Sequence, residues 1–353
     1  MKWPDEAESS VEKTRLLLYT PRMVDVKTEN EPVETEGKHK SAQSRGPDSF
    51  SLAHLSDLHL TSLNHVKTPQ LLNKRMLGYC SWWHKRRHIH RREIIDSLID
   101  DLRDTCPDHI AVTGDLTHLG LPMEYAEVGQ WLPSLGPPEQ VTVIPGNHEA
   151  YWGKDWLDSC AMWAPYLESD TTQRETSKTA DFFPSVRIRG QIAIIGLCSA
   201  TPSLPLLAIG SLGQEQLSKL ETILQETGNK GLLRIIMIHH PPVPGLVNWR
   251  KRLTDSRAFA GILARHGAEL VLHGHAHNPT LSKLQTPGGY VSVVGGASAS
   301  QLSPPSSHNA TYNIYRLSRI GADWDLTMFV RCYSEKSGRF VEEQQATLSL
   351  PRF

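Results

Sequence analysis

The sequence predicts a layered α/β fold in which helices cover β-sheets. Between Phe50 and Leu272, short apolar runs alternate with segments whose apolar residues recur at helical spacing. After Gly288 the pattern changes to strands without helices, at residues 290–294, 311–317 and 324–331. Alternating strands and helices are typical of helix-covered sheets, and the closing run of strands predicts a second sheet packed against the first.

The individual elements follow from local patterns. Residues 93–102 place five apolar side chains on one helical face, and residues 109–113 and 141–144 are apolar runs that end at polar, glycine-containing turns. Such runs are typical of buried strands. By the same patterns, the other expected strands are residues 50–55, 191–197, 232–238 and 269–272, and the other expected helices are residues 123–132, 214–225 and 258–266.

Composition indicates the size and bounds of the domain and bears on nucleic-acid binding. The chain has 353 residues with 39% hydrophobic and 21% charged, which is long enough for a sizeable core. Residues 1–48 are polar and lack hydrophobic periodicity, so we predict a disordered tail before a domain at 49–353. The net charge of −1 provides no overall attraction to nucleic acid, and no obvious nucleic-acid surface is evident.

Cysteine usage and hydropathy indicate the compartment. The five cysteines are widely spaced and form no CxxC pair, which disfavours both a disulfide framework and a zinc knuckle. No run of about 18 apolar residues is present, and the acidic N-terminus does not resemble a signal peptide. We therefore expect a cytoplasmic protein.

Metal-binding side chains follow five of the expected strands. The segments are Asp57-Leu58-His59, Gly114-Asp115, Gly146-Asn147-His148-Glu149, His239-His240 and Gly274-His275-Ala276-His277. Ligands bind at the carboxyl ends of strands in α/β sheets, so these groups are expected to converge. A spacing of two residues would point both side chains of each D-x-H or H-x-H pair to the same side of an extended segment. Carboxylate, imidazole and amide ligands without thiolate suit Mn, Fe, Zn or Mg.

The order D-x-H, GD, GNH-acid, strand-end His and GHxH closely resembles the calcineurin-like metallophosphoesterases, over residues 50–296. The resemblance implies a four-layer α/β/β/α sandwich with two mixed sheets and an active site at the strand C-terminal ends. It also implies two divalent metal ions. Asp57, His59 and His277 would bind the first, Asn147, His239 and His275 the second, and Asp115 both. His239 is preferred to His240 because the family's ligand directly follows the strand.

The same resemblance implies a mechanism. Attack on a phosphate ester would come from a metal-bound hydroxide, with Asp115 holding the metals and His148 assisting the leaving group. Two divalent ions, two carboxylates and one hydroxide would leave a charge of about +1, which attracts phosphate. The Asp-Arg pair that follows the GD motif in protein Ser/Thr phosphatases is absent, which disfavours that activity. Glu149 and His118 are alternative partners to orient His148.

The segment after the first motif sets the substrate alternatives. Residues 60–92 contain eight Lys or Arg and no acidic residue, interleaved with aromatics such as Trp82 and Trp83. We expect an insertion at about 64–92 that overhangs the site. Its residues 70–92 would either bind a phosphate-rich or lipid-like substrate, provide peripheral membrane contact, or form a helical hairpin whose tryptophans pack on the core. A second aromatic segment, residues 151–166, would line the pocket or pack the domain.

These observations favour a phosphodiesterase with a phosphate-ester substrate. The Pro241-Pro242 context resembles class III cyclic-nucleotide phosphodiesterases, whereas the basic-aromatic insertion resembles bacterial UDP-diacylglucosamine pyrophosphatases that act at a membrane. A repair-type nuclease is a weaker alternative because no long basic surface is evident. A non-catalytic metal-binding scaffold is the alternative outside enzymes. The sequence leaves the oligomeric state open.

Overall fold

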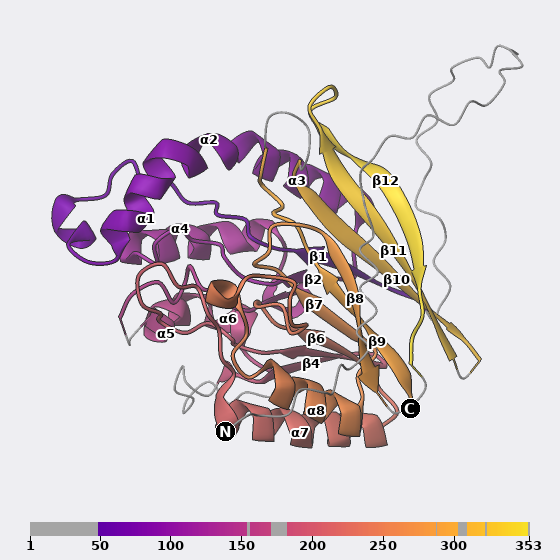
Figure 1. The fold of residues 1–353 in the computed structure, drawn as a ribbon. Helices are drawn as coiled ribbons and strands as arrows, with labels where there is room; N and C mark the ends of the chain where they lie inside the picture. The colour runs from indigo at the N-terminus through magenta and orange to yellow at the C-terminus, as the bar shows by residue number, and fades with distance from the viewer. Residues whose placement is uncertain are drawn as a thin grey trace, which may run out of the picture.

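Two six-stranded sheets form the centre of the protein (Figure 1). The computed structural model describes residues 49–153, 156–170, 182–286, 288–302, 309–321 and 323–351. The tail predicted at residues 1–48 lies outside the described residues. No described helix is long and apolar enough to cross a membrane.

The first sheet combines the N-terminal strands of the domain with its last three strands. Its order is β12-β11-β10-β1-β2-β3. Strands β1, β2 and β3 run parallel to one another, and β10 joins β1 antiparallel. The strands are β1 (Ser49–Leu55), β2 (His109–Val112), β3 (Val141–Val143), β10 (Thr311–Ile320), β11 (Asp323–Ser334) and β12 (Arg339–Leu348).

The second sheet is built from the middle of the chain, in the order β4-β5-β6-β7-β9-β8. Strands β5, β6, β7 and β9 are parallel, and β4 and β8 pair antiparallel at the two edges. The strands are β4 (Ser185–Arg189), β5 (Ile192–Gly196), β6 (Leu233–Met237), β7 (Leu270–His273), β8 (Thr280–Thr286) and β9 (Gly289–Gly295). Both sheets are mixed, as predicted.

Helices cover the outer face of each sheet. Figure 1 shows α3 (Arg92–Thr105) and α4 (Pro122–Trp131) on the side of the first sheet, and α7 (Gly213–Asn229) and α8 (Ser256–His266) beneath the second. Successive side chains of β5 face opposite layers, which shows the layering directly. Ile192 and Ile194 belong to the core cluster that includes residues of both sheets, whereas Ala193 and Ile195 pack with α7 and α8. The predicted four-layer α/β/β/α sandwich is therefore confirmed.

The basic segment at 64–92 forms short helices that extend from the body of the fold (Figure 1). Trp82 is buried with Leu63, Leu71 and Leu119, while Trp83 is 44% exposed. The Arg75 guanidinium donates to the carbonyl oxygens of Leu119 and Gly120 and so fixes the segment to the loop after β2. Its elements are a 3₁₀ turn (Thr68–Leu71), α1 (Arg75–Ser81), a π-helical turn (Trp82–Arg86) and α2 (Arg87–Ile89).

Several short or amphipathic elements had no clear sequence pattern. Strands β4, β8 and β12 lie at sheet edges, and their polar, partly exposed residues leave little hydrophobic signal. In the second aromatic segment, Trp156 and Trp163 pack in the core and Trp152 is exposed. The remaining short helices are α5 (Trp156–Ser159), α6 (Ala164–Leu167) and 3₁₀ turns at Leu132–Ser134, Pro138–Gln140, Cys160–Trp163 and Trp249–Lys251. All five cysteines are free.

Candidate metal centre

The five predicted ligand segments meet at one edge of the two sheets. In the first sheet, Asp57 and His59 follow β1, Asp115 follows β2, and Asn147 follows β3. In the second sheet, His239 follows β6, and His275 and His277 follow β7. The strands that carry them are parallel within each sheet, so their carboxyl ends lie together.

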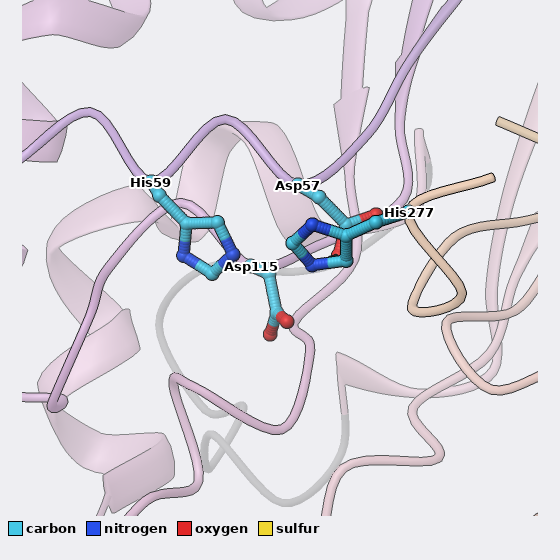
Figure 2. Close-up of side chains that lie close together, drawn as sticks. All are labelled: Asp57, His59, Asp115 and His277. Atoms are coloured by element: carbon cyan, nitrogen blue, oxygen red, sulfur yellow. Dashed lines mark ion pairs between the residues drawn. The ribbon is translucent and has the colours of Figure 1, made fainter. Parts of the chain in front are cut away.

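The first group of side chains is Asp57, His59, Asp115 and His277, which offer ligand atoms that all lie within 4.8 Å of one another. Figure 2 shows their side chains directed toward a common point. The His277 Nε2 atom lies 3.2 Å from Asp57 Oδ1. The other Asp57 oxygen is held by the Ser56 hydroxyl at 2.6 Å and the His275 amide at 3.0 Å, so Oδ1 is left for the centre.

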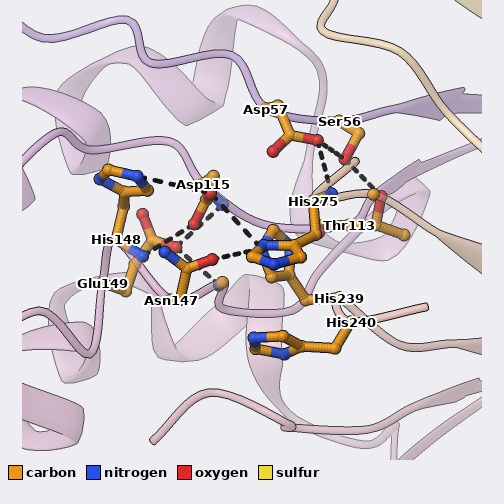
Figure 3. Close-up of polar contacts among 12 residues, drawn as sticks. Ser56, Asp57, Thr113, Asp115, Asn147, His148, Glu149, His239, His240 and His275 are labelled. Atoms are coloured by element: carbon orange, nitrogen blue, oxygen red, sulfur yellow. Dashed lines mark hydrogen bonds and ion pairs between the residues drawn. The ribbon is translucent and has the colours of Figure 1, made fainter. Parts of the chain in front are cut away.

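The second group is Asp115, His239 and His275, again with ligand atoms within 4.8 Å. Asn147 Oδ1 lies 3.1 Å from His239 Nε2, which adds the amide oxygen to the same place (Figure 3). Asp115 belongs to both groups. Its position is that of a ligand shared by two metal ions.

Hydrogen bonds orient the imidazoles for metal binding. His59 Nδ1 lies 2.8 Å from the Thr117 carbonyl oxygen, and His239 Nδ1 lies 2.6 Å from that of Thr113. A carbonyl only accepts, so both rings carry their proton on Nδ1 and turn a free Nε2 lone pair inward. Within the described part of the chain, His59 Nε2, His275 Nε2 and Asp57 Oδ1 are buried without a hydrogen-bond partner. Buried unpaired nitrogen and oxygen atoms facing one point fit divalent cations.

The backbone at these ligands is strained. Among the described residues, seven non-glycine residues have a φ angle in the left-handed region, and five of them are predicted ligands: Asp57, His59, Asp115, His275 and His277, at 52°, 42°, 56°, 67° and 55°. Left-handed backbone is costly for such residues and clusters at functional sites. The expectation that each pair lies on an extended segment was therefore wrong. The pairs converge because tight left-handed turns redirect the chain.

Two glycines allow the loops to approach this closely. A Cβ on Gly114 would lie 2.5 Å from the Gly146 backbone nitrogen and 2.9 Å from His239 Nδ1. A Cβ on Gly146 would lie 2.7 Å from His239 Cε1. No larger residue fits at either position without moving a ligand loop.

Comparison with known proteins agrees with this geometry. The sequence model described as calcineurin-like phosphoesterase matches residues 50–279. The chain belongs to this family. Among curated relatives, a probable cyclic nucleotide phosphodiesterase of Synechococcus is 30% identical over 186 residues, and one of Rhodococcus erythropolis is 25% identical over 245 residues. The glycerophosphodiester phosphodiesterase GpdQ of Enterobacter lignolyticus is 26% identical over 241 residues.

These matches differ in coverage. They span 51%, 68% and 66% of this phosphoesterase, and 62%, 69% and 72% of the three relatives, so less than two thirds of the Synechococcus protein is covered. A solved structure of a dimetal phosphatase from Danio rerio covers 84% of this chain and 98% of its own, with a TM-score of 0.52 at 15% identity. That likeness supports the fold of the phosphoesterase.

The carboxylates of Asp115 and Asp57 stay charged despite their burial. Burial acts to raise the pKa of Asp115, but electrostatic attraction to the His239 and His148 rings outweighs burial, so this pKa lies well below its ordinary value. At Asp57, burial is likewise outweighed by the charge of His277, and the pKa is lowered. Buried anionic oxygens of this kind require cations as partners. Members of the calcineurin-like phosphoesterase family hold two divalent metal ions at such a site.

Glu149 organises the loops of the phosphoesterase site instead of orienting His148. Its carboxylate accepts hydrogen bonds from the amides of Asp115, Leu116, Thr117 and Gly146, at 2.7 to 3.0 Å, and from the Thr117 hydroxyl. Burial and the Asp115 charge raise the pKa of Glu149 to about 7. One side chain thus ties the GD loop after β2 to the GNH loop after β3.

His148 is oriented by a backbone carbonyl. Its Nδ1 lies 2.5 Å from the His118 carbonyl oxygen, and its amide donates to Asp115 Oδ1 at 2.8 Å. Burial lowers the pKa of His148 to about 4, against the opposing charge of Asp115. Of the two expected partners, Glu149 bonds the loop amides instead of His148, whereas His118 orients the His148 ring through its main-chain carbonyl oxygen. The His148 Nε2 atom lies 3.9 Å from Asp115 Oδ2, which is close to the centre.

Two site residues from the insertion were not singled out by the sequence analysis. The His90 ring lies 4.7 Å from that of His59, measured between centroids, and its Nδ1 lies 2.7 Å from the Ser300 hydroxyl. Arg86 Nη1 lies 3.1 Å from His148 Nε2. The available signal was the acid-free basic segment beside the first ligand motif. That signal could not show which basic residue turns inward.

His240 lies beside the centre without joining either ligand group. Its Nδ1 is 2.8 Å from the Ser199 hydroxyl, and Figure 3 shows its ring apart from the network around Asp115. His273 is buried, with its Nδ1 bonded to the Gly274 carbonyl. Neither residue belongs to the two ligand groups.

A cavity of about 490 Å³ adjoins His59, one of the predicted ligands. Its walls include Trp82, His90 and Arg91 of the insertion, together with His118. Residues of the basic segment 64–92 therefore border a cavity beside His59.

Proposed function

We propose that this protein is a dinuclear metal-dependent phosphodiesterase. The observation that carries the proposal is the carboxylate of Asp115, which belongs both to a group of four candidate ligands and to a group of three. Within each group, the ligand atoms lie within 4.8 Å of one another. The proposed ligands are Asp57, His59, Asp115, Asn147, His239, His275 and His277. The nitrogen and oxygen donors without sulfur are suited to Mn, Fe or Zn, with Mg as a further candidate.

When bound, two such ions supply an activated hydroxide and neutralise charge on the phosphoryl group. The chain's own residues then position the reaction. The Thr113 and Thr117 carbonyls hold His239 and His59 in the metal-binding tautomer. His148 is proposed to assist the leaving group from Nε2, since its bond to the His118 carbonyl through Nδ1 is retained when the ring is doubly protonated.

A diester substrate is supported by two observations. The relatives with phosphodiesterase names include both cyclic nucleotide and glycerophosphodiester enzymes. The loop from Gly114 to Gly120 lacks the Asp-Arg pair of the protein Ser/Thr phosphatases. We therefore favour a small phosphodiester over a phosphoprotein.

The test is hydrolysis of bis-p-nitrophenyl phosphate with added Mn. We expect activity in the parent and a loss in kcat/KM of more than about 100-fold in Asp115→Ala and His239→Ala, because even partners that only orient a ligand contribute 10- to 100-fold. His65→Ala is the matched control, since that histidine is exposed and belongs to neither ligand group. Full activity in both site variants would refute the ligand assignment.

The same assay separates the enzyme from a scaffold. A parent protein that holds two metal ions, measured by elemental analysis, and hydrolyses no diester would refute the phosphodiesterase and support a metal-binding scaffold. Comparing 3′,5′-cyclic nucleotides with glycerophosphodiesters would then assign the substrate class.

Exposed leucines favour a second candidate, a nucleotide-lipid pyrophosphatase at a membrane surface. Leu72 and Leu77 of the insertion are 73% and 54% exposed, and Leu204 and Leu206 are 72% and 77% exposed. Lys74 Nζ donates to the Ser203 carbonyl at 2.9 Å, which brings the two segments together. Apolar residues among basic ones suit an anionic membrane.

Sedimentation with anionic and neutral vesicles tests this membrane contact through residues 70–92. We expect salt-sensitive binding to anionic vesicles that Leu72→Ser and Leu204→Ser weaken. Equal recovery of parent and variant in the supernatant would contradict it. The cytoplasmic location expected from the sequence stays a prediction.

A further inference from the structure

Arg86 is directed inward from a surface rich in basic residues. It ends the π-helical turn Trp82–Arg86, and its Nη1 atom lies 3.1 Å from Nε2 and 3.4 Å from Nδ1 of His148. Its neighbours behave differently. Lys85 is exposed, and the Arg87 guanidinium stacks 3.9 Å from the centre of the exposed Trp83 ring. Extra residues per turn in π-helices re-aim side chains and are frequent at functional sites.

The charge of Arg86 lacks a paired anion. Within the part of the chain that the structure describes, no carboxylate lies within ion-pair distance of its guanidinium. Burial lowers the pKa of Arg86, while the charges of Asp115 and Asp57 act to raise it. An arginine side chain nevertheless remains protonated, so a partly buried cation stands beside the metal centre. Asp57 and Asp115 would be neutralised by divalent ions, which leaves Arg86 without compensation until an anion binds.

The contact with His148 leaves most of the guanidinium free. Since arginine only donates, His148 Nε2 must accept, and its Nδ1 proton is used by the His118 carbonyl. Among the described residues, the His148 ring is the hydrogen-bond partner of the Arg86 guanidinium. A phosphate oxygen carries negative charge and accepts more strongly than a neutral imidazole, and the planar guanidinium can bind two such oxygens at once.

From this geometry we propose that Arg86 of the insertion binds the phosphoryl oxygens of the substrate. Binding exchanges its acceptor from His148 Nε2 to phosphate, and the freed Nε2 can then take up a proton from water and donate that proton to the leaving oxygen. The insertion is therefore part of the active site, because it places a cation beside the metal centre where a phosphoryl group would bind. This inference rests on the proposed function, because it names how the same site holds its substrate.

The test compares Arg86→Met, Arg86→Lys and the control Lys85→Met. The first measurement is titration of inorganic phosphate into the Mn-loaded proteins by calorimetry. We expect phosphate affinity to fall about 10- to 100-fold in Arg86→Met, the range for loss of a charged hydrogen bond. Arg86→Lys should fall between Arg86→Met and the parent, because a lysine retains the charge without the planar fork. Lys85→Met should match the parent.

The second measurement is kinetics with bis-p-nitrophenyl phosphate. Arg86→Met should raise KM and lower kcat/KM by a similar factor, with unchanged metal content and thermal midpoint. A purely structural arginine would instead change metal content or midpoint. Should Arg86→Met fail to fold, Arg86→Lys decides, and parental phosphate affinity in that variant would overturn the inference.

Failure of the two proposals can be told apart. An inactive parent that still binds phosphate through Arg86 would refute the phosphodiesterase and retain this site. An active parent whose phosphate affinity and kcat/KM are the same in Arg86→Met and Lys85→Met would refute the role of Arg86 alone.

Discussion

Glu149→Gln is the sharpest test of how the metal loops are held. The substitution keeps the size of the side chain but replaces one acceptor oxygen by an NH₂ group. In the less costly orientation, the NH₂ group occupies the position of Oε2. In the parent protein, Oε2 accepts from the amides of Asp115 at 3.0 Å and Gly146 at 2.7 Å. Both buried amides then face another donor.

The magnitude follows from those two bonds. A buried donor left without its acceptor costs about 1–3 kcal/mol, so two cost about 2–6 kcal/mol of unfolding free energy. The opposite orientation would leave the Leu116 and Thr117 amides unpaired as well as the Thr117 hydroxyl, and would cost more. Because both affected amides belong to ligand loops, metal affinity should also fall by about 10- to 100-fold.

Urea unfolding at pH 8, above the pKa of about 7 of Glu149, measures the first effect. Titration of Mn or Zn by calorimetry measures the second. Glu226→Gln is the matched control, because Glu226 is exposed on α7. Loss of less than about 0.5 kcal/mol, the usual range for a surface change, together with parental metal affinity would refute the role given to Glu149.

Two further predictions concern acid stability and metal removal. Burial lowers the pKa of His109 to about 3, against 6.5 when unfolded, so the unfolded chain binds more protons between these values and stability is lost as pH falls below about 6.5. In His109→Gln, which can still bond Thr142, the loss of unfolding free energy from pH 7 to pH 5 should be smaller by about 2 kcal/mol, and parallel pH curves for parent and variant would contradict this. Chelation should lower the thermal midpoint, because the buried carboxylates of Asp57 and Asp115 lose their cations, and added metal at about 100 times its Kd should restore about 2.7 kcal/mol. A midpoint that is insensitive to chelator and metal would show that these residues hold no ion.

Much of the fold was predictable because its central strands are buried on both faces. Strands β1, β2, β3, β6 and β7 read as apolar runs, and helices such as α3 show apolar residues at helical spacing. Edge strands gave no comparable signal, since six of the ten residues in β12 are exposed and its sequence alternates weakly. The segment 64–92 was recognised by charge, but its helices are too short for periodicity to define.

Residue types and their order were sufficient to predict which side chains form the site. Carboxylate and imidazole side chains at strand ends marked the segments, and the resemblance to the calcineurin-like family then assigned individual ligands such as Asp57, Asp115 and His239. The route by which they converge was not predictable. The left-handed turns at Asp57, His59 and Asp115 depend on loops that are distant in the chain and meet only in the folded protein. The His275 amide, for example, donates to Asp57 Oδ2 across 218 residues of sequence.

Tertiary structure alone decided the surroundings of the metal ligands. The sequence placed a carboxylate at Glu149 and basic residues at 85–87, but local patterns do not show where a side chain points. Packing of the insertion against Leu119 turns Arg86 toward His148 and leaves Lys85 in solvent. The sequence by itself determined the chemistry at this centre, because ligand type is a property of each residue. The orientation of His148 and the direction of Arg86 were decided by contacts between distant segments.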